Sequence, residues 1–378
     1  MAKDVYISAT NCITPMGFDV ETNVENILSG RSGISQFTDR QLMEHPFHAA
    51  MLDKDELDKA ASQIKNVDNY TKLERMMILA LAPIIAQSQS KLNPRTAFIL
   101  STTKGNITAL ENPQQPIQKA QLSQLARTVA DHFGFQAEPI VVSNACVSGI
   151  LAVAIAKRMI QANLYDEAFV VSGDLVSEFV LSGFNSFQAM SDLPCKPYSA
   201  NRTGVTLGEA TAAVWVTSDP AHAKAKILGD GSINDANHIS GPSRTGEGLF
   251  RSIESAMKEA KMDAQQIDYI SAHGTATPFN DEMEAIAFNR LGLQNVPINS
   301  LKGYYGHTLG ASGLLETVIG IESMNRNRLF ASMGFDEIGV SQPIEVIKEN
   351  HEKEIDIFLK TASGFGGCNT AVLFEKIK

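Results

Sequence analysis

Short apolar runs alternate with longer amphipathic segments along almost the whole chain. Residues 72–88 and 249–261 carry apolar side chains at helical spacing, and each is predicted to be a helix. Short runs rich in Val, Ile, Phe and Ala, bounded by Gly, Pro, Asn or Ser, are typical of buried strands. These runs are residues 4–9, 96–101, 167–174, 210–218, 268–273, 296–300, 357–365 and 369–375. Such alternation predicts an α/β fold with largely buried sheets.

One thiol lies between two of the apolar runs. The segment SNACVSGI, residues 143–150, places Cys146 after a short predicted strand and before an apolar predicted helix, residues 150–160. Unpaired amide groups and the helix dipole stabilise a thiolate at such a turn, so a nucleophile would gain reactivity there. A free cysteine is more often a small core residue, and this stretch alone favours that simpler interpretation.

Three loops in the second half of the chain also follow predicted strands. The first presents His273 in HGTATP, and the second presents Lys302 and His307 in LKGYYGHTLGASG. The third breaks a strand at the glycines of residues 364–367. Lone histidines and lysines are usually structural or exposed, and glycines can simply bend a strand. One thiol and two histidines at strand ends are nevertheless improbable as core residues, because α/β proteins place their sites there.

A faint internal repeat suggests that the chain has two similar halves. Residues 147–151 (VSGIL) match residues 311–315 (ASGLL), and each segment opens an apolar predicted helix. Residues 219–226 (DPAHAKAK) form the most linker-like segment near the middle. We therefore expect an N-terminal half, residues 1–224, with the cysteine, and a C-terminal half, residues 225–378, with the histidine, lysine-histidine and glycine-rich motifs.

Composition and charge argue against several classes of function. The 378 residues carry a formal charge of −10 and no long basic cluster, which argues against nucleic acid as the main partner. The four cysteines are far apart and form no CxxC pair, so neither a zinc site nor a disulfide framework is expected. No signal peptide and no apolar run of membrane-spanning length is apparent. A cytoplasmic protein is expected.

Taken in order, the motifs resemble those of the β-ketoacyl-acyl carrier protein synthases, the elongating Cys-His-His type of the thiolase-like condensing enzymes. The resemblance covers essentially the whole chain and includes a segment with arginine, proline, aromatic and GEG-like elements. The matching segments are NCITPMG (11–17), SNACVSG (143–149), KPYSANRTGVTLGEA (196–210), AHGTATPFND (272–281), KGYYGHTLGASG (302–313) and SGFGGCN (363–369). The resemblance implies a five-layer αβαβα fold of two similar halves.

The resemblance also implies an activity, namely decarboxylative Claisen condensation of a cysteine-bound acyl group with a malonyl thioester on a carrier protein. Cys146 would carry the acyl group, because a thiolate both attacks thioesters and leaves readily. His273 and His307 would donate hydrogen bonds to the enolate oxygen. The backbone N–H groups of Cys146 and Phe365 would hold the oxyanion, and the Phe365 ring would act as a gate.

Other roles and partners follow from the resemblance. Lys302 would pair with Glu284, and Thr275 and Thr277 would contact the phosphopantetheine arm. No cofactor would be bound permanently, since the substrates arrive on the phosphopantetheine of an acyl carrier protein. The chain would form a homodimer, or a heterodimer with a related subunit. Carrier docking on an acidic chain needs a local basic patch, and the candidates are Lys72, Lys196 and Arg202.

Two alternatives stay open. A non-catalytic chain-length subunit of a ketosynthase heterodimer usually lacks the nucleophile, whereas this chain keeps it. A thiolase would use a second cysteine in a C-terminal glycine-rich motif, a position that Cys368 could occupy. Departures from the family pattern favour a specialised branch, such as aryl-polyene or related polyketide-like lipid synthesis, over housekeeping fatty-acid elongation. They are Asn144, Thr203, Ala210, Tyr304, Tyr305 and Cys368.

Overall fold

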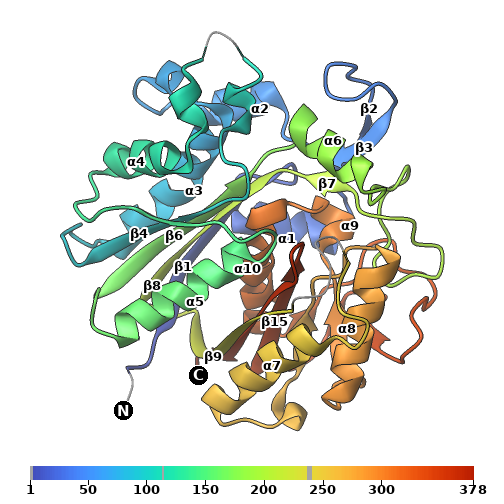
Figure 1. Ribbon diagram of the computed structural model, residues 1–378. Helices are drawn as coiled ribbons and strands as arrows, with labels where there is room; N and C mark the ends of the chain where they lie inside the picture. The colour runs from blue at the N-terminus through green and yellow to red at the C-terminus, as the bar shows by residue number, and fades with distance from the viewer. Residues whose placement is uncertain (1–2, 113–114, 236–240) are drawn as a thin grey trace.

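The computed structural model describes residues 3–112, 115–235 and 241–378 (Figure 1). Its strands are β1 (Tyr6–Ile13), β2 (Ile34–Phe37), β3 (Phe47–Ala50), β4 (Thr96–Ser101), β5 (Ile140–Val142), β6 (Glu167–Asp174), β7 (Leu207–Gly208), β8 (Ala210–Thr217), β9 (Ala225–Asn234), β10 (Tyr269–Ser271), β11 (Pro297–Asn299), β12 (Arg328–Leu329), β13 (Glu345–Val346), β14 (His351–Glu352), β15 (Ile357–Gly364) and β16 (Cys368–Lys376). Its α-helices are α1 (Val20–Leu28), α2 (Lys54–Ala61), α3 (Lys72–Ser88), α4 (Leu122–Phe133), α5 (Ser148–Gln161), α6 (Glu178–Ser186), α7 (Glu247–Ala260), α8 (Pro278–Arg290), α9 (Lys302–Tyr305) and α10 (Ser312–Asn325).

Local sequence explains several of these boundaries. The predicted helix of residues 72–88 coincides with α3, which begins after Thr71 because Thr71 and Glu74 form a capping box. The predicted helix of residues 249–261 starts two residues earlier, as α7. The strand expected at residues 268–273 is shorter, because β10 ends at Ser271 and leaves His273 in the following loop.

A long mixed sheet runs through the described part of the molecule, in the order β13-β11-β10-β15-β16-β9-β1-β8-β6-β4-β5. The strands β1, β8, β6, β4 and β5 repeat the spatial and sequential order of β9, β16, β15, β10 and β11. The two sets join where β1 pairs antiparallel with β9, through Tyr6 and Ile7. The fold therefore consists of two similar halves, as expected, and we propose to keep their boundary between residues 224 and 225, since β9 begins at Ala225.

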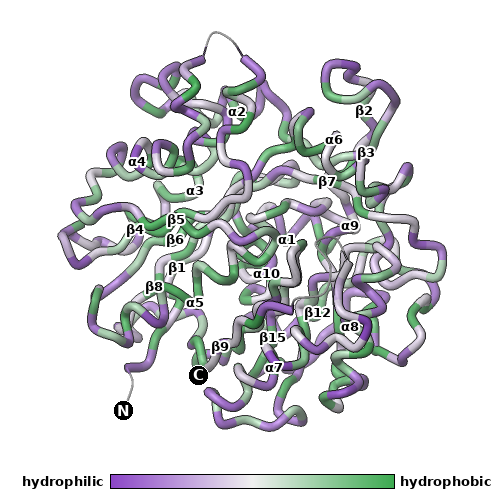
Figure 2. Tube along the Cα trace, in the orientation of Figure 1, coloured by the Kyte–Doolittle hydropathy of each residue, from purple (hydrophilic) through white to green (hydrophobic). Residues whose placement is uncertain are grey.

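Helices fill the space on both sides of each half-sheet, which gives five layers in the order αβαβα (Figure 1). The first layer contains α3, which packs through Leu73 and Met77 against β1, β6 and β8, and α4, which packs against β4 and β5. The central layer, α5 and α10, lies between the half-sheets, and the last layer, α7 and α8, packs on β9, β15 and β16. Hydrophobic residues accordingly concentrate along the inner strands and central helices (Figure 2). Among the described residues, no helix is both long and apolar enough to cross a membrane.

The two central helices meet through the glycines of the internal repeat. A Cβ atom on Gly149 would lie 2.7 Å from the backbone nitrogen of Leu314. A Cβ atom on Gly313 would lie 2.7 Å from the backbone nitrogen of Ile150, so the contact is reciprocal. Any side chain at either position would push α5 and α10 apart. The repeat that was faint in the sequence therefore marks the centre of the molecule.

We predict that Gly149→Ala and Gly313→Ala each destabilise the protein by about 1–3 kcal/mol, the usual effect of overpacking a close contact. Urea unfolding followed by circular dichroism measures the change. Gly183→Ala is the matched control, since a Cβ atom on this α6 glycine meets nothing within 4 Å. Equal stability of the central variants and the control would contradict the proposed role of the contact.

Candidate active site

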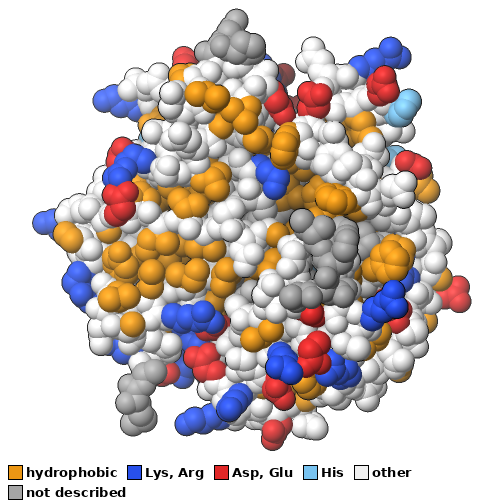
Figure 3. Space-filling view, in the orientation of Figure 1, with side chains coloured by type: hydrophobic (Ala, Val, Ile, Leu, Met, Phe, Trp, Pro, Cys, Tyr) orange, Lys and Arg blue, Asp and Glu red, His pale blue; other side chains and the backbone are white. Residues whose placement is uncertain are grey.

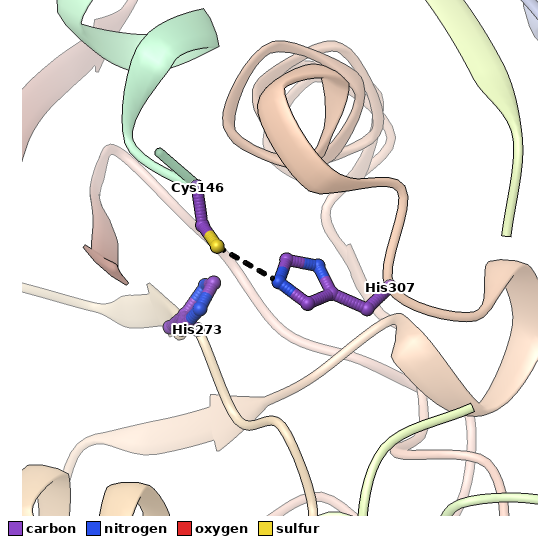
Figure 4. A group of neighbouring side chains, drawn as sticks. All are labelled: Cys146, His273 and His307. Atoms are coloured by element: carbon purple, nitrogen blue, oxygen red, sulfur yellow. Dashed lines mark hydrogen bonds between the residues drawn. The ribbon is translucent and has the colours of Figure 1, made fainter. Parts of the chain in front are cut away.

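Cys146 lies on the turn between β5 and α5 (Figure 4). The preceding residue, Ala145, has a φ of 43°, an uncommon left-handed conformation that turns the chain sharply before the thiol. Ser148 stabilises the turn, because its hydroxyl accepts the Asn144 N–H at 2.8 Å and donates to the Ala145 carbonyl at 2.6 Å. The thiol is 7% exposed.

His307 faces this thiol from the second half of the chain (Figure 4). Its Nε2 atom lies 3.1 Å from the Cys146 Sγ atom. Its Nδ1 atom lies 2.9 Å from the Ser312 hydroxyl, which also accepts the Thr308 N–H at 3.1 Å. Ser312 occupies the same position in its repeat as Ser148 does in the first half. Equivalent serines therefore support the loops of both Cys146 and His307.

His273 completes the cluster, and its ring centroid lies 5.2 Å from that of His307. The N–H groups of His273 and Gly274 donate to Glu284 at 2.9 and 2.7 Å. The Lys302 ammonium donates to the His273 carbonyl and lies 3.4 Å from its Nδ1 atom. Because an ammonium group can only donate, Nδ1 accepts and the ring proton resides on Nε2.

The expected pairing of Lys302 with Glu284 is wrong. Lys302 instead forms an ion pair with Glu316 of α10, at 2.7 Å. Glu284 is committed to the two backbone N–H groups of the His273 loop, to Asn280 and to the Tyr198 hydroxyl. Glu284 still supports the site, but it does so by holding the His273 loop.

Burial dominates the protonation of all three side chains. It holds the pKa of His273 and of His307 well below the usual range, and the nearby ammonium groups of Lys302 and Lys360 lower both further. Burial also raises the pKa of the Cys146 thiol to about 12, although Lys302 and the Phe365 N–H partly oppose the shift. The helix start was expected to stabilise a thiolate, but burial outweighs that effect in this state, in which the site holds a thiol and two neutral imidazoles.

A cavity of about 360 Å³ opens onto the cluster. Thr275 and Thr277 line it, with their hydroxyl oxygens 2.8 Å apart. The Phe365 ring also lines it, stacked on Phe184 at 5.6 Å between centroids and edge-on to Phe187 at 5.4 Å. The structure thus brings Cys146, His273, His307, Phe365 and both threonines to one cavity, while Lys302 and Glu284 lie behind the His273 loop.

The comparisons with known proteins agree with this geometry. The family model described as beta-ketoacyl synthase, N-terminal domain, matches residues 2–222, and its C-terminal domain model matches residues 224–336. This chain belongs to the β-ketoacyl synthase family. It is therefore a ketosynthase, an acyl-transferring enzyme with the thiolase-like fold.

Individual relatives are similar over their full length. The 3-oxoacyl-[acyl-carrier-protein] synthase 2 of Staphylococcus aureus (strain COL) is 25% identical over 416 aligned residues, which cover 100% of this chain and 99% of that protein. The ketosynthase ApeO, solved with its chain length factor ApeC from Xenorhabdus doucetiae, is 25% identical with a TM-score of 0.89; the match covers 99% of this chain and 98% of that one. A β-ketoacyl synthase from Burkholderia phymatum STM815 has a TM-score of 0.88 at 22% identity, with 100% of both chains covered.

The ketosynthase geometry leaves the two alternatives without support. A chain-length subunit without a nucleophile does not fit, because Cys146 and both histidines are in place around the cavity. Cys368 is absent from the cavity lining, and its Sγ atom faces the Asn144 and Phe365 carbonyls at 3.7 and 3.6 Å, so it is not arranged as a second catalytic thiol.

Cys146, His273 and His307 are also the one group in the described ranges with the spacing of metal ligands. Two buried lysines, Lys302 and Lys360, lie behind these side chains, and their positive charges disfavour binding of a divalent cation there.

Of the three basic residues expected at the docking surface, only two are accessible. The Arg202 side chain is 8% exposed, and its guanidinium lies 3.6 Å from the buried Asp281 carboxylate, so it is a structural residue. Lys72 and Lys196 are about one-third exposed but pair with Glu209 and Asp336, respectively.

Sequence reasoning missed three polar residues next to the cluster, namely Ser312, Glu316 and Lys360. Ser312 was visible as the repeat partner of Ser148. Glu316 and Lys360 interrupt apolar segments, and a charged residue in a buried element usually has a partner. Which partner it has depends on the packing of the halves.

We predict that alkylation of Cys146 by limiting iodoacetamide accelerates about tenfold per pH unit between pH 7 and 10, because a thiol whose pKa is raised to about 12 gains thiolate throughout this range. Peptide mapping gives the rate for each cysteine. Cys146 should react before Cys12, Cys195 and Cys368, since it alone of the four lines the cavity. A rate that levels off near pH 7 would instead indicate a preformed thiolate.

Proposed function

We propose that this ketosynthase condenses an acyl group carried on Cys146 with a malonyl group delivered by an acyl carrier protein, releasing carbon dioxide. One observation carries the proposal: a thiol and two neutral imidazoles from different halves meet at one cavity, with Cys146 Sγ and His307 Nε2 3.1 Å apart. This arrangement supplies a nucleophile and two uncharged N–H donors.

The first half-reaction loads the enzyme. The Cys146 sulfur attacks the acyl thioester, the bond between carbonyl carbon and carrier sulfur breaks, and the proton of the cysteine thiol ends on the departing pantetheine thiolate. The N–H groups of Cys146 and Phe365 would hold the oxyanion. The Phe365 N–H is already directed at the sulfur, and the Gly364 backbone packs so closely that a Cβ atom there would lie 3.0 Å from the Cys146 nitrogen.

The second half-reaction generates the carbon nucleophile. Loss of carbon dioxide from the malonyl thioester leaves an enolate, whose oxygen would accept hydrogen bonds from Nε2–H of His273 and of His307. Lys302 supports this role for His273, because it leaves Nδ1 only the acceptor role. Neutral donors suit the step, since an imidazolium would protonate the enolate and end the reaction.

Ser312 gives His307 a freedom that His273 lacks. A hydroxyl can donate to Nδ1, which leaves Nε2–H as a donor to the enolate, or accept from Nδ1–H, which leaves Nε2 free to take the thiol proton. His307 could thus relay the proton during loading and donate during decarboxylation. We therefore assign Ser312 a positioning role in both half-reactions.

Condensation closes the cycle. The enolate carbon attacks the Cys146 thioester, the tetrahedral oxyanion collapses, and the carbon–sulfur bond to the enzyme breaks, which yields a β-ketoacyl carrier and the Cys146 thiolate that a proton then neutralises. Thr275 and Thr277 would contact the pantetheine arm, since their hydroxyls line the cavity. Phe365 would separate the acyl and malonyl sides, held by Phe184 and Phe187.

The pathway is a narrower inference. Departures such as Thr203 at the cavity favour a specialised, polyketide-like or aryl-polyene branch, and the likeness to a ketosynthase solved with its chain length factor supports that direction. A cytoplasmic location and the absence of a permanently bound cofactor remain predictions.

We predict that the two half-reactions separate by mutation. Cys146→Ala should abolish acyl loading and condensation but still release carbon dioxide from malonyl carrier. His273→Ala and His307→Ala should each load but lose decarboxylation by about 10²–10³-fold, the usual loss for one oxyanion donor. The double variant should lose little more, because both donors serve one charge. Carbon dioxide release and intact-mass loading on the same preparations measure both steps.

His351→Ala is the control, since this residue is exposed and its ring hydrogen-bonds to the neighbouring Glu349 carbonyl, outside the cavity. Normal decarboxylation by the double histidine variant would overturn the proposed mechanism.

We also propose a dimer through the face that carries β5 and α5. Strand β5 is the edge of the sheet and pairs only with β4 among the described strands. On α5, the half-buried side chains Leu151, Ile155 and Met159 repeat every fourth residue. Figure 3 shows apolar side chains gathered on this face over α4 and α5. An identical or related subunit would cover both the open strand edge and this stripe.

We expect light scattering of the purified chain to give about twice its 40.9 kDa mass. Ile155→Glu should reduce the mass to that of a monomer while preserving the helical circular dichroism, and Glu254→Lys on the exposed side of α7 serves as control. A wild-type monomer that dimerises only with a related chain would identify a heterodimer, and a monomer under both conditions would contradict the proposal.

A further inference from the structure

Lys360 is a buried cation that none of the motifs includes. It lies in β15, on the strand that leads to the Phe365 turn, and its side chain is 0% exposed. Its ammonium group forms an ion pair with Glu316 at 2.6 Å and donates to the carbonyls of Ser271 and Thr361, at 3.1 and 2.7 Å. A fully buried lysine is rare, and this one is adjacent to the reacting histidines.

The pairing around Glu316 leaves positive charge in excess. Its two carboxylate oxygens contact different lysines, Lys302 at 2.7 Å and Lys360 at 2.6 Å. Two ammonium groups thus share one carboxylate in a space where all three side chains are at most 3% exposed. A purely structural pair would be served by one lysine, since each additional buried charge carries a desolvation penalty. The presence of a second buried lysine, Lys360, therefore indicates a role beyond pairing with Glu316.

The backbone contacts of Lys360 point to the His273 loop. Lys360 holds the Ser271 and Ala272 carbonyls at the end of β10, where the strand ladder stops. Lys302 holds the next carbonyl, that of His273, and Glu284 accepts the N–H groups of His273 and Gly274. Buried charged side chains therefore hold three successive carbonyls and the two N–H groups that follow β10. Lys360 holds the first two of these carbonyls, those of Ser271 and Ala272.

We propose that Lys360 is a positioning residue for decarboxylation, which anchors the end of β10 beneath His273 and, together with Lys302, places an ammonium group behind the histidines. The proposal rests on the proposed function, because it assigns the Lys360 ammonium group to the enolate that forms at the histidines. A cation behind the donors lowers the energy of that anion without contacting it.

Other charged groups face the same loop, and they limit the effect. From α8, the Asp281 carboxylate accepts the Thr275 N–H at 3.0 Å and is balanced by Arg202, while Glu284 accepts from the His273 loop. Burial raises the pKa of both carboxyl groups, that of Asp281 to about 7. The Cys146 thiol faces His307 from the turn before α5. Asp281 balances Arg202, Glu316 balances one of the two lysines, and Glu284 opposes the other from the far side of the loop.

Lys360→Met tests the proposal. The change removes the charge at nearly constant volume and leaves Glu316 in a one-to-one pair with Lys302, so the fold should survive. We expect kcat for carbon dioxide release from malonyl carrier to fall about tenfold or more, with KM little changed and acyl loading of Cys146 retained. Lys157→Met is the matched control: Lys157 is equally buried, its acid partner Asp230 keeps Arg158, and its other acid partner, Glu259, is partly exposed. The control should keep wild-type rates.

A second measurement reads the histidines directly. In wild-type protein labelled with 15N-histidine, the ring signals of His273 and His307, assigned by loss in His273→Gln and His307→Gln, should stay those of neutral imidazole below the pH at which an ordinary histidine titrates. Removal of a neighbouring cation raises the pKa of an imidazole, so in Lys360→Met these signals should titrate at higher pH than in wild type. Lys157→Met should leave them unchanged.

Two outcomes would overturn the inference: wild-type kcat in Lys360→Met, or an equal loss of loading and decarboxylation with unshifted histidine signals, which would mark a merely structural residue. If Lys360→Met does not fold, histidine signals that titrate near pH 6.5 in the wild type would overturn it as well. Failure of the wild-type enzyme to release carbon dioxide would instead refute the proposed function, and the histidine titrations would still report the electrostatic effect of Lys360.

Discussion

The close contact between α5 and α10 is the constraint on which the site depends. Each helix begins after a loop that carries a side chain of the proposed catalytic cluster, Cys146 before α5 and His307 before α10. Because Gly149 and Gly313 bring the two helix backbones together, the thiol and the imidazole approach to 3.1 Å. The half-sheets on either side hold the helices in place, and the outer helices exclude water from the sheets.

Around this contact, the charged residues are arranged to keep the reacting groups uncharged. Lys302, Glu316 and Lys360 lie behind the histidines, where burial and positive charge together disfavour imidazolium. The same burial raises the pKa of the Cys146 thiol, so that it too is uncharged in this state. A site that binds an anionic malonyl group and forms an enolate benefits from this state, because it supplies donors without supplying protons.

Much of the fold and of the cavity could be predicted from the sequence. The capped helix of residues 72–88, the strand ends before His273 and Lys302, and the nucleophile turn all have local signals, and the order of the motifs identifies the family. Ion-pair partners and protonation states could not be predicted. Glu284 lies close to His273 in sequence, whereas the real partner of Lys302, Glu316, is presented by the central helix across the loop. Likewise, the pKa of Cys146 depends on how deeply the assembled halves bury it, which a helix-start argument does not include.

The twin serines of the repeat suggest how a duplicated half-domain acquired a division of labour. Ser148 and Ser312 each support the loop ahead of a central helix, yet one loop presents sulfur and the other nitrogen. The contact between the serine hydroxyl and the preceding loop is the same in both halves, and only the side chain that the loop carries differs. Since neither serine nor glycine belongs to the outer layers, loops and surface helices can diverge in length and sequence while the reaction geometry persists. Within one such chain, the reaction geometry can therefore stay the same while the range of substrates changes.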